Sequence, residues 1–486
     1  MLFNSYVFLF AFLPVVAVGF FAFGALRWRR VALAWLVLAS LYFYAFWNVA
    51  YVPLLAGSIG ANYAIGYALA RTRENRRFLR RALLVAAIAA NLALLGYFKY
   101  TDFAISTVDA LAGAAFPLQH IVLPLAISFF TFNQIAYVVD VYRREATEYD
   151  LLNYAFFVSF FPHLIAGPIV HHRDIMPQLR TIPYRFGVLD VAIGSTIFAI
   201  GLFEKVVLAD TIGPKADAVF GAAADGAALG AAATWAGVIA YALQLFFDFA
   251  GYSDMAIGAA RIFGITFPFN FNAPYRATNI VDFWRRWHMT LSRFLRDYLY
   301  IALGGNRYGP VRRYANLGIT MLLGGLWHGA AWTFVIWGGL HGAYLIINHA
   351  WERIGRFAGI GAFQRHPIGT AAGYAVTMVA VLVGWVFFRA RDLPTALQLC
   401  AAMAGAHGVG PSPSVSLLLQ LTALAAAATV LPNTQELLRL VSAPRERFVF
   451  PLQWRPNRRW SVAVGVLAAI AIICCARSST FLYYQF

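Results

Sequence analysis

Long apolar stretches, separated by short polar segments, run through this chain of 486 residues. A helix needs about 20 apolar residues to cross the hydrocarbon layer of a membrane. Eleven stretches approach or exceed that length, and one of them, 314–350, is long enough to cross twice. The sequence therefore predicts an all-α polytopic membrane protein with about 11–12 transmembrane helices. The stretches are 6–26, 31–49, 52–70, 82–98, 117–141, 187–209, 229–250, 314–350, 368–388, 412–431 and 461–477.

Composition and charge support a membrane location. Charged residues make up 12% of the chain, against about 25% in soluble domains, so a water-soluble globular protein is excluded. The net charge is +17, but the arginines cluster in short segments between the apolar stretches, as the positive-inside rule describes. We therefore expect contact with membrane lipid and no nucleic-acid partner. The arginine runs at 27–30, 71–81 and 261–313 should be cytoplasmic.

One apolar segment, 151–170, lies between two arginine-bearing segments that both belong on the cytoplasmic side. A single crossing would place its ends on opposite faces. Pro162, Gly167 and Pro168 interrupt the segment, and irregular backbone at membrane depth is tolerated only around a protein-lined or water-filled cavity. The sequence therefore predicts a re-entrant hairpin that lines a cavity.

The arginine-rich interfacial region 261–313 holds nine arginines and two acidic residues. Apolar residues recur at helical spacing from 281 to 295, which predicts an amphipathic helix at the cytoplasmic interface with His288 on its inward side. The arginines can bind anionic lipid, or some of them can hold the phosphates of an anionic cytosolic donor. Arg285 and Arg286, with the neighbouring Trp284, are the candidates for the donor side.

His328 lies near the centre of the 314–350 stretch, in the segment GGLWHGAAW at 324–332. An ionisable residue at that depth is costly and indicates a functional site, although a neutral histidine bonded inside a helix bundle is the other interpretation. In FFDFAGYSD at 246–254, two aspartates lie six residues apart, a spacing that favours structural hydrogen bonding over paired acid–base chemistry. His171 and His172 are expected in a solvated loop.

Motifs of several other enzyme classes are missing from the sequence. It contains no HExxH, no phosphate-binding P-loop and no Gly-x-Ser-x-Gly elbow. Its three cysteines, Cys400, Cys474 and Cys475, do not have metal-ligand spacing. We therefore expect no metal site.

Four segments carry a resemblance to a known family. They are PHLIAGPIVHHRDIMPQL at 162–179, FFDFAGYSDMAIGAARIFGITFPFNFNAPY at 246–275, FWRRWHMTLSRFLRDYLYIALGGNR at 283–307 and LLGGLWHGAAWTFVIWGGLHG at 322–342. With the opening MLFNSYVFLFAFLPV and the ending FLYYQF, they resemble the membrane-bound O-acyltransferases, and among these the membrane subunits of bacterial alginate O-acetyltransferases. The resemblance runs the length of the chain and predicts a single domain over 1–486.

This resemblance implies re-entrant and interfacial helices around a membrane-embedded tunnel. The signature histidine of the family matches His328, and its second polar site matches His288, so these are the candidate catalytic residues. His328 would act as a general base on an acceptor hydroxyl or carry the acyl group itself, since an imidazole with a pKa of about 6.5 suits both roles. His288 would orient the donor or the acceptor by hydrogen bonding.

The resemblance also implies an enzyme of the bacterial inner membrane. It would move an acetyl or other acyl group from a cytosolic thioester such as acetyl-CoA across the membrane for O-acetylation of an exported or cell-wall polysaccharide similar to alginate. Acetyl-CoA would be a substrate, and no tightly bound cofactor is expected. The expected partners are a periplasmic or membrane-anchored acetyltransferase and the polysaccharide, reached directly or through that partner.

Two other functions stay open at this point. A polytopic transporter also has buried polar residues and broken helices, although it often shows an internal repeat, and none is visible here. A structural subunit of a polysaccharide export complex is the other.

Overall fold

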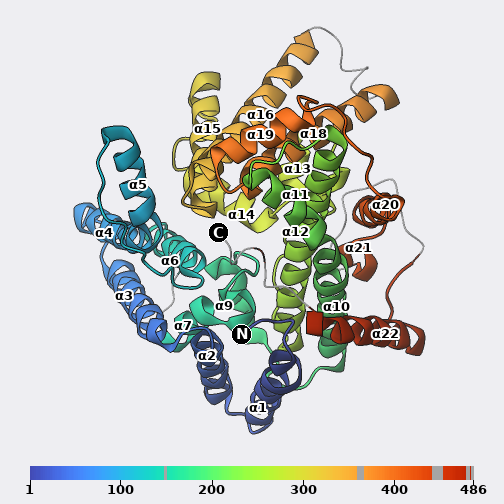
Figure 1. Ribbon diagram of the computed structural model, residues 1–486. Coiled ribbons are helices and arrows are strands. Elements are labelled where there is room, and N and C mark those ends of the chain that lie inside the picture. Colours follow the sequence, from blue (N-terminus) through green and yellow to red (C-terminus); the bar gives the residue numbers. More distant parts are fainter. Residues whose placement is uncertain (147–149, 358–365, 440–451, 478–481, 483–486) are drawn as a thin grey trace. The chain divides into compact units, whose positions relative to one another are not determined.

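The computed structural model describes residues 1–146, 150–357, 366–439, 452–477 and Leu482 (Figure 1). Within these ranges every regular element is a helix, and no strand occurs. The all-α prediction is therefore confirmed. The C-terminal FLYYQF, apart from Leu482, lies outside the described residues.

Six helices in the described part of the chain are long and apolar enough to cross a membrane. This confirms a polytopic membrane protein. By helix length and apolar composition, the described residues form fewer membrane-spanning helices than the 11–12 expected. Several apolar stretches fold into shorter helices. The 117–141 stretch becomes helical only at Ile127, where the 16-residue helix α6 begins, and the 412–431 stretch forms only the 15 residues of α20. The six spans are Phe8–Ala25, Val49–Arg71, Arg77–Ala112, Val188–Ala224, Ala231–Ile262 and Pro367–Arg389.

Contacts within the chain group it into two compact units. Unit 1 comprises Met1–Leu202, Tyr252–Pro268 and Pro456–Ala476. Unit 2 comprises Phe203–Gly251, Phe269–Arg455 and Arg477–Phe486. This grouping does not test the expectation of a single domain over 1–486, which stays a prediction.

Unit 1 holds most helices of the N-terminal half and one C-terminal helix. Its core is aromatic: the ring of Phe161 lies 5.2 Å from that of Phe12 and 5.6 Å from that of Phe43. Its helices are α1 (Leu13–Ala25), α2 (Arg29–Ala45), α3 (Val52–Arg71), α4 (Arg77–Leu95), α5 (Thr101–Ala112), α6 (Ile127–Tyr142), α7 (Leu151–Ser159), α8 (Phe161–Leu164), α9 (His172–Thr181), most of α10 (Val188–Phe203) and α22 (Arg458–Cys474).

The segment predicted to be re-entrant is interrupted in the structure. Helix α7 ends at Ser159, the single turn α8 follows, and the backbone then stays non-helical until His172. A Cβ on Gly167 would lie 2.6 Å from the Cα of His163, so this turn requires glycine. Its return to the same membrane face stays a prediction. The solvated loop expected for His171 and His172 is wrong, because both side chains are buried, 0% and 3% exposed.

Unit 2 holds the long helix α12 (Ala231–Ile262) up to Gly251, and the helices that follow it except α22. It also holds three short turns of other helix types, at Glu204–Ala209, Pro274–Arg276 and Leu295–Tyr300. Its remaining helices are α11 (Asp210–Ala224), α13 (Ile280–Arg286), α14 (Met289–Phe294), α15 (Gly309–His328), α16 (Trp332–Phe357), α18 (Pro367–Arg389), α19 (Leu393–Met403), α20 (Val415–Thr429) and α21 (Thr434–Leu438).

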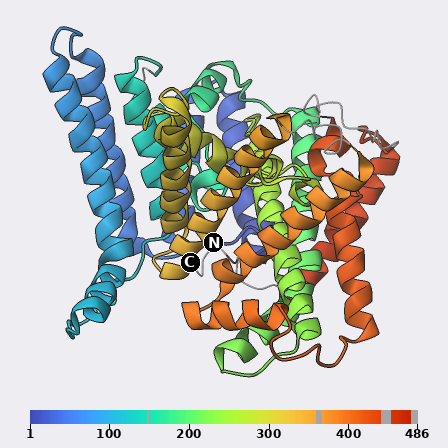
Figure 2. The ribbon, with the colours of Figure 1, turned by 90° about the horizontal axis from the view of Figure 1, so that it is seen from above.

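The apolar stretch 314–350 forms a helical hairpin, with α15 and α16 side by side (Figures 1 and 2). The chain leaves the helix at Gly329 and re-enters it at Trp332. Close approach depends on glycines: a Cβ on Gly325 would overlap the carbonyl oxygen of Phe334 and lie 3.0 Å from the Cα of Gly338. The hairpin therefore places the end of α15 firmly against the beginning of α16.

Asp248, on α12, belongs to a buried ion cluster in unit 2. Lys205 Nζ lies 2.8 Å from Asp248 Oδ1 and 2.6 Å from Asp210 Oδ1, and the lysine side chain is only 1% exposed. The other carboxylate oxygen of Asp248 accepts a hydrogen bond from the backbone N–H of Leu482, at 3.1 Å. These contacts agree with the structural role that the spacing of the aspartates favours.

Candidate active site

His288 lies at a break between two short helices of unit 2. Helix α13 ends at Arg286 and α14 begins at Met289, and His288 between them has a left-handed backbone with φ of +41°. The continuous amphipathic helix predicted through 281–295 is therefore wrong. A non-glycine residue in this conformation is strained and persists only where its surroundings hold it.

Asn270 makes several of the contacts that keep His288 in this conformation. The backbone N–H of Met289 donates to the carbonyl oxygen of Asn270 at 2.8 Å. The side-chain Oδ1 of Asn270 lies 2.9 Å from His288 Nδ1 and accepts from the hydroxyl of Thr290 at 2.9 Å. Because an amide oxygen only accepts, His288 Nδ1 must carry the proton, which leaves a lone pair on Nε2. The contact assigns one tautomer to the ring.

The imidazole of His288 is fully buried, 0% exposed. Phe249 meets it edge-on, with ring centroids 4.8 Å apart. Nε2 has no hydrogen-bond partner within the described parts of the chain. Burial lowers the pKa of His288, so the ring is neutral at pH 7 and its Nε2 lone pair stays open to a ligand.

His328, the last residue of α15, lies beside His288, with the two ring centroids 6.5 Å apart. It is 6% exposed. The rings of Trp327, Trp337 and Phe388 surround it at 5.0, 5.1 and 5.2 Å. The structure therefore brings the two predicted catalytic residues together, from different helices, in an aromatic and largely dry environment.

A third histidine, His341, reaches the same cluster from α16. Its ring lies 4.8 Å from that of Trp337, which also contacts His328. Trp284 Nε1 donates to His341 Nδ1 at 3.2 Å, so the other ring nitrogen carries the proton. Sequence reasoning gave His341 no functional role. The sequence feature that could have identified His341 is its position one turn after Trp337 on α16, the second helix of the hairpin.

The three residues predicted for the donor side lie in different environments. Trp284 is buried, 8% exposed, against His341. Arg286 pairs with Asp282, with Nε 3.0 Å from Oδ1. Arg285 is exposed at the surface. The structure thus brings Trp284 to the histidines and leaves Arg285 accessible, and their donor-binding role stays a prediction.

This arrangement is suited to proton and acyl chemistry. A neutral imidazole can take the proton of a hydroxyl or attack a carbonyl itself, and both reactions gain from a site that excludes water. No group of three or more His, Cys, Asp and Glu side chains in the described residues could hold a metal ion.

Comparison with known proteins identifies relatives that cover most of the chain. The family model for MBOAT, the membrane-bound O-acyltransferase family, matches residues 116–383. The peptidoglycan O-acetyltransferase of Helicobacter pylori is 44% identical over 441 residues, which cover 84% of this chain and 81% of that protein. The probable alginate O-acetylase AlgI of Pseudomonas aeruginosa is 42% identical over 409 residues, covering 83% of this chain and 75% of that protein. A teichoic acid D-alanyltransferase of Bacillus subtilis is 30% identical over 249 residues, 49% of this chain and 62% of that protein.

Proposed function

Because the chain belongs to the membrane-bound O-acyltransferase family, we propose that it transfers an acetyl or other acyl group to a polysaccharide, using a cytosolic thioester such as acetyl-CoA. It is an O-acyltransferase and a multi-pass membrane protein. The names of its relatives, which act on alginate or peptidoglycan, support a polysaccharide acceptor. We place the reaction in the bacterial inner membrane, with the donor on the side of the arginine-rich region 261–313.

The observation that carries this proposal is the buried pair formed by His288 and His328, 6.5 Å apart. His328 acts as general base: it takes the proton of an acceptor hydroxyl while the hydroxyl oxygen attacks the thioester carbonyl. The carbon–sulfur bond then breaks, and the leaving thiolate takes that proton. In the other route a ring nitrogen of His328 attacks the thioester carbonyl, the carbon–sulfur bond breaks and the thiolate leaves. The acyl group then passes from His328 to the acceptor hydroxyl, the ring returns to its neutral form, and the proton of the hydroxyl ends on the thiolate. His288, held by Asn270, orients the donor or acceptor through Nε2.

A separate acetyltransferase on the outer side is the proposed partner for transfer to the polymer. Arg285 and Arg286 would meet the phosphates of the donor at the cytoplasmic face, where Arg285 is already exposed. Trp284 would contact the donor next to His341.

The test uses the full chain in liposomes with radiolabelled acetyl-CoA, with and without the partner, and follows thioester loss and acetyl transfer. General-base catalysis contributes about 10²–10⁴ in rate, so His328→Ala should cost about 3–5 kcal/mol in transition-state stabilisation. His407→Ala, at an exposed histidine, is the matched control. Wild-type turnover in His328→Ala would contradict the assignment. Turnover that depends on His328 would also separate an enzyme from a transporter or a structural export subunit.

A further inference from the structure

The strained backbone at His288 is hydrogen-bonded to an irregular segment, residues 270–272. The backbone N–H of Asn272 donates to the carbonyl oxygen of Arg286 at 2.9 Å, and that of Met289 donates to Asn270 at 2.8 Å. Two backbone hydrogen bonds therefore bracket His288, and the side chain of Asn270 holds its ring. Whatever fixes segment 270–272 also fixes the imidazole of His288.

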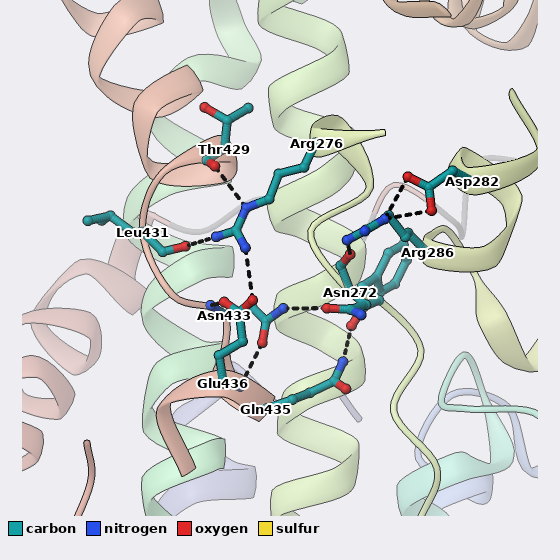
Figure 3. Close-up of polar contacts among 10 residues, drawn as sticks. Asn272, Arg276, Asp282, Arg286, Thr429, Leu431, Asn433, Gln435 and Glu436 are labelled. Atoms are coloured by element: carbon teal, nitrogen blue, oxygen red, sulfur yellow. Dashed lines mark hydrogen bonds and ion pairs between the residues drawn. The ribbon is translucent and has the colours of Figure 1, made fainter. Parts of the chain in front are cut away.

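Arg276, four residues after this segment, is hydrogen-bonded to the end of α20 and to the residues that follow it (Figure 3). Its guanidinium donates from Nε to the carbonyl oxygen of Thr429 at 2.8 Å and from Nη2 to that of Leu431 at 2.5 Å. Its Nη1 pairs with Glu436 Oε1 at 2.8 Å, and both side chains are about four-fifths buried, 20% and 21% exposed. One arginine thus engages three residues more than 150 positions away in the sequence.

The short helix α21 then contacts segment 270–272 directly. Asn433 Nδ2 donates to Asn272 Oδ1 at 2.8 Å, and Gln435 Nε2 donates to the carbonyl oxygen of Phe271 (Figure 3). Asn433 and Glu436 also form a capping box, in which each side chain accepts from the backbone of the other at 2.9 Å. The box orients the amide of Asn433 toward Asn272.

From these contacts we infer that residues 429–436 form a clamp that positions His288, with Asn433, Gln435 and Glu436 as positioning residues. They touch segment 270–272 and Arg276 rather than the reacting groups. The clamp lies outside residues 116–383, the part of the chain that the family model matches. This inference rests on the role of His288 in the proposed function, and it assigns a catalytic consequence to a C-terminal segment.

Asn433→Ser isolates the contact between clamp and segment. Serine caps a helix about as well as asparagine, so α21 keeps its start. Its hydroxyl is too short to replace the amide that reaches Asn272. Asn457→Ser is the matched control, because Asn457 caps α22 in the same way through a 3.0 Å bond from the backbone of Trp460. Since small misplacements of catalytic groups cost up to about 10²-fold, we expect Asn433→Ser to lower kcat about 10- to 100-fold per folded molecule and Asn457→Ser to leave it unchanged.

A double-mutant cycle with His288→Ala shows whether the effect passes through His288. Sites that act through one another are not additive. Asn433→Ser should therefore lower kcat in the wild-type background and have no further effect when His288 is already alanine. Equal fold-changes in both backgrounds would overturn the clamp. If His288→Ala itself retains full turnover, the proposed function of His288 fails instead, so the two failures are distinguishable.

Gln435→Met provides a second, independent disruption. It keeps the length of the side chain and removes the donor to Phe271. Gel filtration and thermal unfolding give the folded fraction of each variant. If the loss of activity in Asn433→Ser and Gln435→Met equals the loss of folded protein, the contacts only stabilise the fold and the inference is overturned.

Discussion

Gly325 allows α15 to approach α16 one turn before His328, and a single methyl group there should displace this proposed general base. In Gly325→Ala the new Cβ would overlap the carbonyl oxygen of Phe334 and lie 3.0 Å from the Cα of Gly338. Both neighbours are backbone atoms and cannot rotate away. Carbon atoms in contact lie about 3.5–4.0 Å apart, so relieving the contact with Gly338 alone requires a helix separation of about 0.5–1 Å, and the closer oxygen of Phe334 requires more.

That displacement has a predictable cost for activity and for stability. A shift of 1 Å at a reacting group can lower the rate about 10²-fold. We therefore expect Gly325→Ala to lower turnover about 10- to 100-fold. Overpacking of this kind destabilises by about 1–3 kcal/mol, so the melting temperature should also fall.

The adjacent glycine provides a matched control on the same helix. In Gly324→Ala the new Cβ meets the end of the Leu295 side chain at 3.3 Å, and that methyl group can move. Replacing glycine by alanine inside a helix gains about 0.5–1 kcal/mol, so this variant should stay active and stable. The assay is turnover per folded molecule in liposomes, with thermal unfolding in parallel. If Gly325→Ala turns over as fast as Gly324→Ala, close helix approach does not position His328.

Three further predictions concern groups buried in unit 2. Lys205→Met leaves the buried carboxylates of Asp210 and Asp248 without their cation and should lower the free energy of unfolding by about 3–5 kcal/mol. An unchanged melting temperature in detergent would contradict this role of the ion cluster. Burial lowers the pKa of His288 below the value of about 6.5 in an unfolded chain, so the stability that its neutral form contributes is present above pH 6.5 and decreases below it. Melting temperatures of wild type and His288→Gln should therefore diverge between pH 7.5 and pH 5.5 as the wild type loses stability faster, and parallel curves would refute this. In Gly384→Ala the new Cβ lies 2.9 Å from His341 Nε2 and should displace that ring. Turnover and the melting temperature should therefore fall, and unchanged values of both would disprove the displacement.

The hydrophobic pattern predicted the features that depend on local sequence. Apolar stretches became helices, the 314–350 stretch became a hairpin, and the segment with Pro162 and Gly167 was interrupted. These outcomes follow from backbone hydrogen bonding and residue size, which act over a few positions in the chain. The selection of His288 and His328 together as candidate catalytic residues, in contrast, rested on the family resemblance and not on periodicity.

Long-range contacts account for the features that the pattern did not predict. Apolar spacing continues from 281 to 295, yet the helix breaks at His288, where Asn270, 18 residues earlier, bonds both its ring and the next residue's backbone. The clamp of residues 429–436 acts on the same segment across more than 150 residues. A single sequence carries no periodic signal for such contacts, because polar side chains in irregular segments repeat at no fixed spacing.

The direction of one hydrogen bond limits what His288 can do in the reaction. Its Nδ1 donates to Asn270, so Nε2 presents a lone pair and no proton. A ring in this state can accept a hydrogen bond from a hydroxyl or an amide N–H, but it cannot donate one to the oxyanion that develops on a thioester carbonyl. In the other tautomer the Nδ1 lone pair would face the amide oxygen of Asn270, and a buried hydrogen bond would be lost. His288 is therefore suited to hold the hydroxyl or amide side of a substrate, and stabilisation of the oxyanion must come from another donor.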